Sequence, residues 1–154
     1  MPRLISKTDA HTRKLGEQIG RAVTGSFTIA LTGDLGAGKT TLVQGMAKGL
    51  GVAEKYYVTS PTYNIINEYP AGLLRLCHID LYRLGAVDEL DYLGFEDILD
   101  QNALVAVEWP QLLKETGFQF DLEIHIGFDD NHDRIISLTG SGHRARNLLS
   151  RLSL

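Results

Sequence analysis

The sequence has one cysteine and no long apolar run, and each absence excludes a class of protein. Cys77 has no second cysteine with which to form an internal disulfide, and its apolar neighbours in the sequence predict a buried structural thiol. No segment approaches the ~18 apolar residues that a membrane-spanning helix needs. The first residues turn polar at once, without the apolar stretch of a signal peptide. We therefore expect a cytoplasmic protein that makes no contact with a membrane.

Positive charge is scarce as well. The 154 residues include 15 Lys and Arg against 19 Asp and Glu, which gives a net charge of −4. Nucleic acid favours a basic surface because its phosphates are negatively charged, so it is not expected as the main ligand. The C-terminal part differs, since residues 134–154 hold four arginines and no carboxylate. This basic end is either a solvated helix or a surface that binds a partner.

Helical patterns are spread along a chain whose length suits one domain, residues 1–154. Thr8 and Asp9 are suited to begin a helix that ends at Gly25. A second helix is expected over residues 40–50, closed by Gly51. Two further helical patterns cover residues 87–99 and 143–154.

Short runs of strand-forming residues lie between these helices. They are found at residues 27–31, 63–69, 73–79, 104–107, 122–128 and 134–139. The short link at residues 70–72 contains proline and glycine, which predicts an antiparallel hairpin. Helices mixed with both kinds of strand predict an α/β layered domain, with a mixed parallel and antiparallel sheet flanked by helices.

A glycine-rich loop follows the apolar run at residues 27–31. Residues 33–40 match the P-loop pattern G-x-x-x-x-G-K-[ST] at every fixed position. Glycines allow backbone N–H groups to turn toward phosphate oxygens, Lys39 adds a full positive charge, and the hydroxyl of Thr40 is a ligand for Mg²⁺. A glycine turn with an exposed lysine is the alternative, but the preceding strand and following helix favour a P-loop NTPase-like fold. The residues expected to bind ATP or ADP are Asp34, Leu35, Gly36, Ala37, Gly38, Lys39, Thr40 and Thr41.

Two carboxylates stand at the ends of predicted strands, where a P-loop protein needs acidic groups beside its metal. Glu108 follows the strand at residues 104–107, and Asp80 follows the second hairpin strand. Either one can be a metal ligand or a plain strand-end carboxylate. The pattern leaves open which of them binds Mg²⁺ directly.

The base is expected to be adenine. A guanine site normally carries N-K-x-D after a strand, and that string is absent. The string D-x-x-G does occur at residues 91–94, but within an acidic helical pattern and not after an apolar strand. We interpret this match as coincidence.

Several further strings occur in a fixed order after the loop. GDLGAGKTT at residues 33–41 is followed by SPTY at 60–63, HIDLYRL at 78–84 and EWP at 108–110. This ordered set resembles the TsaE (YjeE) family over most of the chain. Two departures are Ile79, where phenylalanine is expected, and a pattern that fades after Pro110.

The resemblance implies a small ATPase that supports tRNA threonylcarbamoyladenosine (t6A) modification by acting on a complex of TsaD and TsaB. It implies that tRNA is reached only through that complex. By position, Lys39, Asp80 and Glu108 are the expected catalytic residues, and Thr40, Asp80 and Glu108 are the expected metal site. Arg134 is a candidate contact to the base or ribose.

The string SPTY is either a switch that senses the nucleotide or a polar turn fixed by proline. Its residues are Ser60, Pro61, Thr62 and Tyr63. Trp109 either packs under the site or faces the partner. No arginine is clearly placed as a finger, although Arg83 and Arg134 are candidates, so hydrolysis by the chain alone is expected to be slow.

Two rival functions remain open. One is a small-molecule kinase with a P-loop, and the other is a nucleotide-gated binding module whose hydrolysis is incidental. The acidic stretch at residues 88–100 is either a docking face or a solvated helix surface.

Overall fold

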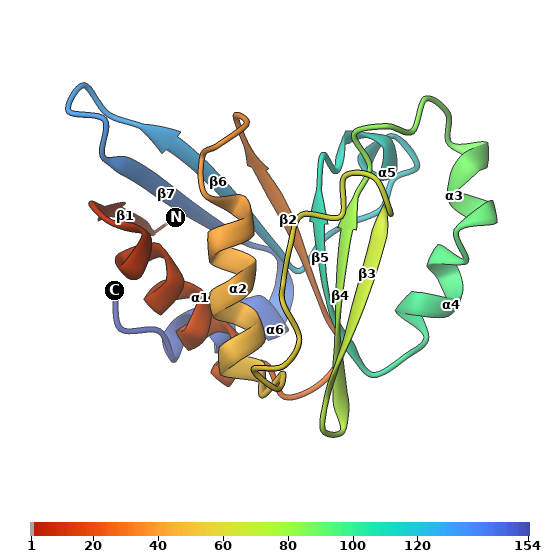
Figure 1. The fold of residues 1–154 in the computed structure, drawn as a ribbon, viewed down its shortest axis with the longest axis horizontal. Helices are drawn as coiled ribbons and strands as arrows, with labels where there is room; N and C mark the ends of the chain where they lie inside the picture. The colour runs from red at the N-terminus through yellow and green to blue at the C-terminus, as the bar shows by residue number, and fades with distance from the viewer. Residues whose placement is uncertain (1) are drawn as a thin grey trace.

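A seven-stranded sheet runs through the computed structural model, which describes residues 2–154 (Figure 1). The strands are β1 (Arg3–Ser6), β2 (Phe27–Gly33), β3 (Ile66–Ala71), β4 (Leu74–Asp80), β5 (Ala103–Glu108), β6 (Leu122–Phe128) and β7 (Arg134–Gly140). Across the sheet they lie in the order β1-β7-β6-β2-β5-β4-β3. The four central strands, β6, β2, β5 and β4, are parallel, whereas β3, β7 and β1 pair with their neighbours antiparallel.

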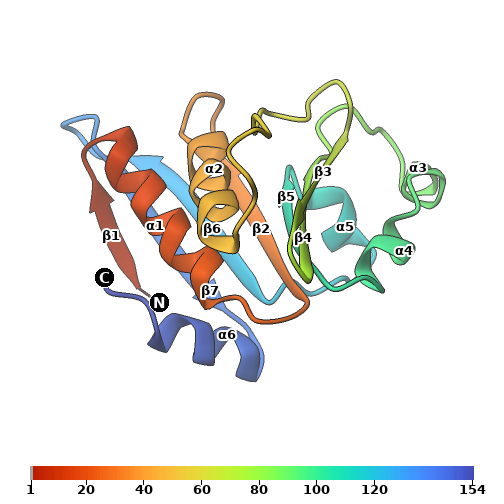
Figure 2. The ribbon, with the colours of Figure 1, turned by 60° about the horizontal axis from the view of Figure 1, so that its bottom comes forward.

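Helices cover both faces of this sheet (Figures 1 and 2). The apolar cluster on one face includes α1 (Asp9–Ala22), α2 (Lys39–Leu50) and α6 (Gly142–Ser150). The cluster on the other face includes α3 (Asp88–Tyr92), α4 (Phe95–Leu99) and α5 (Gln111–Glu115). The predicted α/β layered fold with a mixed sheet is therefore confirmed. None of the helices within residues 2–154 is long and apolar enough to cross a membrane.

The parallel centre of the sheet determines where a ligand can be placed. All six residues of β5 are buried, as expected for a strand covered by helices on both faces. Parallel neighbours align their carboxyl ends at one edge, and in open α/β sheets ligands bind beyond that edge. The glycine loop between β2 and α2 lies at this edge.

The helices α1 and α2 pack backbone to backbone. A Cβ atom at Gly45 of α2 would lie 2.1 Å from the carbonyl oxygen of Arg13, and one at Gly20 of α1 would lie 2.3 Å from that of Met46. Gly16 and Gly49 face the opposite helix in the same way. No side chain fits at these positions while the two helices keep their spacing.

The predicted ends of the first two helices agree closely with the structure. The Thr8 side chain accepts a hydrogen bond from the backbone N–H of His11, 3.1 Å away, and so caps α1. The helix α1 ends at Ala22, three residues before the predicted Gly25. Gly51, with a φ of 102°, closes α2 as predicted.

The acidic helix predicted over residues 87–99 is two helices. The break falls at Gly94, whose φ of 69° is left-handed, and it separates α3 from α4. The sequence pattern missed this break because apolar residues continue at helical spacing across it. The predicted last helix also ends earlier, at Ser150 and not at Leu154.

The hairpin is tighter than predicted. Ala71 pairs with Leu74, so the turn consists of Gly72 and Leu73, while Pro70 and Ala71 belong to β3. Proline is tolerated there because β3 is an edge strand. The strand also begins late, at Ile66 and not at residue 63.

Two short elements were not predicted. β1 has four residues and pairs antiparallel with β7 at the edge of the sheet. α5 has five residues and follows directly after Pro110. Both are too short for a periodic pattern to reveal them, and both are held by packing against elements distant in sequence.

Candidate functional site

The loop between β2 and α2 adopts backbone conformations with positive φ at its glycines. Gly33 and Gly38 have φ values of 143° and 110°, which residues with a side chain rarely adopt. A Cβ atom at Gly33 would also lie 2.6 Å from the carbonyl oxygen of Ile126. α2 begins immediately after Gly38, so the partial positive charge at its N-terminus faces the space beside the loop.

Lys39, the first residue of α2, folds back over this loop. Its Nζ donates a hydrogen bond to the carbonyl oxygen of Gly33 at 2.5 Å and lies 4.8 Å from the centre of the Trp109 ring. The side chain is buried, with 6% of the residue exposed. The ammonium group is thus held at the loop by contacts that a phosphate oxygen can replace.

Two buried carboxylates stand beside the loop, at the ends of neighbouring strands. Asp80 ends β4 and Glu108 ends β5, and the two are register partners in the parallel pair. Glu108 is also paired with Leu31 of β2, two residues before the loop begins. Partners in a parallel ladder direct their side chains to the same face, so the two carboxylates lie side by side.

Each carboxylate is positioned by a specific partner. Asp80 accepts hydrogen bonds from the hydroxyl of Thr62 at 3.1 Å and from the backbone N–H of Tyr82 at 2.9 Å. Glu108 Oε2 lies 2.7 Å from Nε2 of His78, which is fully buried. A carboxylate accepts, so Nε2 carries the proton of this bond. The other ring nitrogen, Nδ1, has no partner among residues 2–154.

These groups open onto one cavity of about 380 Å³. From the loop and α2 it is lined by Leu35, Gly36, Gly38, Lys39, Thr40 and Thr41. From the strand ends and the intervening loops it is lined by Ser60, Thr62, Asp80, Glu108, Trp109 and Arg134. Segments that lie about one hundred residues apart in the sequence are therefore brought together around this cavity.

Four of the predicted site residues do not line this cavity. Asp34 is exposed on the loop, and Ala37 is buried beneath it. Pro61 is also buried, whereas Tyr63 is 83% exposed and has the Arg83 guanidinium 5.2 Å from its ring centre.

Arg134, the first residue of β7, ties the loop to α1. Its Nε donates to the carbonyl oxygen of Ala37 at 2.8 Å, and a terminal nitrogen donates to Asp9 Oδ1 at 2.6 Å. A Cβ atom at Gly38 would lie 2.9 Å from this guanidinium. Asp9 also lines the cavity, and the sequence pattern treated it only as the start of a helix.

Trp109 lies between the cavity and an exposed tyrosine. Its ring centre is 4.9 Å from that of Tyr82 on one side and 4.8 Å from Lys39 Nζ on the other. Its φ of 56° is unusual for a residue with a side chain, and such a conformation costs about 1–3 kcal/mol. Within the chain, Trp109 is thus half-buried between Lys39 and Tyr82.

The fold and this arrangement can be compared with known proteins. The family model described as "Threonylcarbamoyl adenosine biosynthesis protein TsaE" matches residues 6–136. The chain belongs to the TsaE family. Members of this family take part in threonylcarbamoyl adenosine biosynthesis, which connects the chain to the tRNA modification machinery. The resemblance of the ordered motifs to TsaE proteins is thus confirmed.

Individual TsaE proteins show the extent of this similarity. The TsaE of Bacillus subtilis is 41% identical over 125 residues, covering 81% of this chain and 77% of that protein. The TsaE of Aquifex aeolicus is 36% identical over 132 residues, covering 86% and 92% of the two chains. The crystal structure of YdiB from Bacillus subtilis superposes with a TM-score of 0.76 at 31% identity, covering 97% of this chain and 91% of YdiB.

The segment before β3 is tied directly to one of the carboxylates. The backbone N–H of Asp80 donates to the carbonyl oxygen of Ile65 at 2.8 Å, and Ile65 donates to that of Pro61. Ile65 is β-branched and has a φ of 70°, so its backbone is strained. A residue with this left-handed φ cannot continue a strand, so β3 begins only at Ile66. The two hydrogen bonds connect residues 60–65 to the end of β4.

Cys77 takes no part in this site. It lies on the opposite face of β4, fully buried in the cluster beneath α3, α4 and α5. Burial, together with the nearby Glu68 carboxylate, raises the pKa of the thiol to about 12. The predicted buried structural thiol is therefore confirmed.

The oxygen atoms at the site suit a hard cation. Thr40, Asp80 and Glu108 contribute one hydroxyl and two carboxylates to the cavity. Within residues 2–154 there is no cluster of three His, Cys, Asp or Glu side chains that would form a metal site by protein groups alone. Mg²⁺ in nucleotide sites is held by one or two carboxylates completed by water and phosphate, so the residues present fit this ion.

Proposed function

We propose that the chain binds ATP with Mg²⁺ in this cavity and hydrolyses ATP in support of a TsaD–TsaB complex during t6A modification. The observation that carries the proposal is the meeting of Lys39, Thr40, Asp80 and Glu108 in one cavity at the N-terminus of α2. A cationic side chain, a helix N-terminus and two carboxylates together provide for the phosphates and for their metal ion. The lack of an N-K-x-D string favours adenine over guanine.

Each residue has a defined task in this proposal. Lys39 exchanges the carbonyl oxygen of Gly33 for the outer phosphates, and the loop N–H groups surround the same oxygens. Thr40 and one of the carboxylates hold Mg²⁺, which when bound neutralises charge on the phosphates. The other carboxylate orients the attacking water. Glu108 is suited to that task because His78 fixes one of its oxygens and leaves the other for a ligand.

Hydrolysis by the chain alone is expected to be slow because both candidate arginines are already engaged. Arg83 lies over the exposed ring of Tyr63, and Arg134 is bonded to Asp9 and Ala37. An arginine directed at the γ-phosphate can contribute ~10³–10⁵ in rate. This charge would have to come from a partner, or from Arg83 once a movement of residues 60–65 takes the Tyr63 ring away from it.

The test is phosphate release from ATP, measured with and without purified TsaD and TsaB. We expect slow release by the wild type, a clear change on adding the partners, and a loss to background in Lys39→Ala. Lys55→Ala is the matched control, because Lys55 is an exposed lysine beside Tyr56 and lines no part of the cavity. Fast release that ignores the partners would contradict the proposed role, and a phosphorylated metabolite in place of free phosphate would indicate a kinase.

A further inference from the structure

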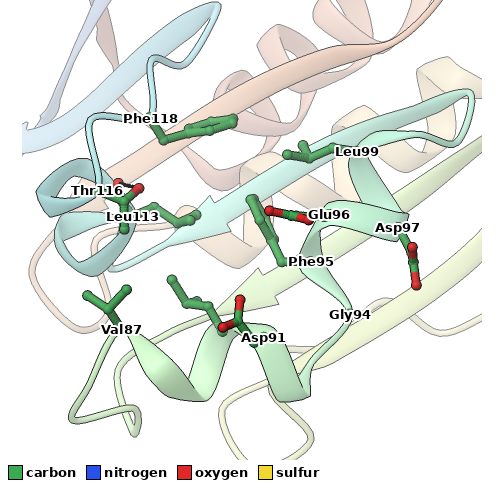
Figure 3. Close-up of a pocket in the computed structure, with 11 residues that line it drawn as sticks. Val87, Asp91, Gly94, Phe95, Glu96, Asp97, Leu99, Leu113, Thr116 and Phe118 are labelled. Carbon is green, nitrogen blue, oxygen red and sulfur yellow. Dashed lines mark hydrogen bonds between the residues drawn. The ribbon is translucent and has the colours of Figure 1, made fainter.

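A cavity of about 480 Å³ lies outside the candidate site, between α3, α4 and α5 (Figure 3). In Figure 3 the side chains of Phe95, Leu113 and Phe118 converge on this space from α4, α5 and the segment after α5. Phe118 is held edge-on between Phe95 and Phe120, with ring centres 5.7 and 4.9 Å away. The floor is therefore apolar, formed by Val87, Leu90, Phe95, Leu99, Leu113 and Phe118.

The rim of this groove is strongly acidic. Asp91, Glu96 and Asp97 line it, and all three are exposed. Residues 88–100 contain six carboxylates, and no Lys, Arg or His occurs from residue 84 to residue 113. Lys114, the first cation after this stretch, forms an ion pair with Glu123. The negative charge around the apolar floor is therefore not neutralised by these neighbours along the chain.

Both walls of the groove continue directly from the candidate site. α5 begins three residues after Glu108, and α3 begins eight residues after Asp80. The two connecting segments are joined where they leave the site, since the backbone N–H of Leu81 donates to the carbonyl oxygen of Glu108 at 3.1 Å. The tilted rings of Tyr82 and Trp109 also pack against each other at this point. The two carboxylates are thus connected to both walls through short segments that are hydrogen-bonded to each other.

We propose that this groove is the docking site for the partner protein, and that it receives a segment with an apolar side chain flanked by lysine or arginine. The inference rests on the proposed function and adds the surface by which the partner meets the ATPase. The acidic rim favours a cationic segment and repels RNA phosphates. The apolar floor provides the anchor position that protein interfaces use.

A second copy of this chain is a poorer occupant because its net charge is −4 and three of its four C-terminal arginines are already engaged. Arg144 pairs with Asp121, Arg151 donates to the carbonyl oxygen of Ala22, and Arg134 pairs with Asp9. These contacts hold α6 and the loop in place, so they are not available to another molecule.

The experiment measures binding of the TsaD–TsaB complex to charge-reversed variants by titration calorimetry. Asp91→Lys with Glu96→Lys reverses the rim, and Glu54→Lys with Asp130→Lys gives the same change in net charge at exposed positions elsewhere. We expect the dissociation constant to rise at least tenfold for the rim variant and to stay within twofold of wild type for the control. Thermal unfolding by circular dichroism checks that both variants fold.

A second variant fills the groove without changing its charge, and so tests whether the partner enters it. Thr116→Trp places a large side chain at an exposed position on the groove, and it is expected to weaken binding by a similar factor. If both the rim variant and Thr116→Trp bind TsaD–TsaB as tightly as the wild type does, the docking site is wrong and the proposed function is unaffected. Failure of the wild-type chain to bind TsaD–TsaB would overturn both. Self-association of the chain that the rim variant abolishes, with unchanged TsaD–TsaB binding, would assign the groove to a second copy and overturn the proposal.

Discussion

Glu108 faces the candidate site with one of its oxygens already held by a histidine. His78 and Asp80 lie two residues apart on β4 and therefore face the same side of the sheet. Glu108 of β5 is the register partner of Asp80 and faces that side as well. A buried carboxylate without such a partner would be costly, because burial removes the hydrogen bonds that water supplies. His78 thus fixes the position of Glu108 without lining the cavity.

This contact predicts different effects for two substitutions of His78. His78→Gln keeps an N–H donor near the position of Nε2, whereas His78→Leu leaves the Glu108 carboxylate without its donor. Loss of a hydrogen bond to a charged group costs about 1.5–3 kcal/mol, so kcat for phosphate release is expected to fall roughly tenfold or more in His78→Leu. His78→Gln should retain most of the activity, and KM for ATP should change little in either. Equal losses in both variants, or a change confined to KM, would show that His78 acts only on the fold.

At this scale, the residues that could be predicted are those encoded locally. The glycine loop, Asp80 and Glu108 are recognisable because each stands directly after an apolar strand. Asp9 escaped prediction because its partner, Arg134, is 125 positions away. His78 belongs to the string HIDLYRL, but its role was not predicted. Its spacing of two residues from Asp80 places both side chains on one face of the strand, and this was the signal that could have revealed it.

Among the secondary-structure elements, the contact between α1 and α2 has the tightest geometry. Glycines on both helices allow the two backbones to touch, and α2 carries Lys39 and Thr40 at its start. The spacing of the two helices therefore helps to fix the position of the Lys39 ammonium group in the site. Glycine has a low helix propensity, so the four glycines in α1 and α2 look unfavourable in the sequence. Their role becomes clear only when the two helices are seen packed together.

Gly45→Ala is expected to destabilise the protein although alanine is the better helix former. The added methyl group would meet the backbone oxygen of Arg13 at 2.1 Å, and backbone atoms cannot move aside as a flexible side chain can. Overpacking of this kind costs about 1–3 kcal/mol, which exceeds the ~1 kcal/mol gained in helix propensity. Urea unfolding measures the difference in the free energy of unfolding.

Gly25→Ala is the control for this prediction. No atom lies within 4 Å of a Cβ added there, so this change should be neutral or slightly stabilising. Unchanged stability in Gly45→Ala would mean that the two helices separate at little cost.

Element boundaries were predictable where a residue enforces them and not where tertiary packing does. Gly51 ends α2 because its backbone is left-handed, and Thr8 begins α1 through a local hydrogen bond. β1 depends on pairing with β7, which lies more than one hundred residues later. Gly94 is left-handed as well, but apolar residues continue at helical spacing across it, so the sequence alone does not reveal the division between α3 and α4.

For the molecule as a whole, the site joins parts of the chain that separate on unfolding. Residues from α1, the glycine loop, two strand ends and β7 meet around the cavity. A ligand that binds this assembly has no equivalent site in the unfolded chain. Binding should therefore raise the stability of the entire fold.

The melting temperature is expected to rise with the logarithm of the concentration of ATP with Mg²⁺. At a free concentration 100 times the dissociation constant the gain is ~2.7 kcal/mol, a shift that thermal unfolding resolves easily. Lys39→Ala should lose most of this shift while its melting temperature without ligand stays near that of the wild type. An equal shift in the variant would show that the nucleotide binds elsewhere.

The glycine contacts between α1 and α2 also divide the molecule mechanically. With Arg134 pinning the loop to α1, the half that contains α1, α2 and β7 forms a stiff frame. The segments that leave Asp80 and Glu108 carry the three short helices of the other half. In the proposed function, any movement that follows γ-phosphate release would then take place in these short helices, because α1, α2 and β7 are held to one another.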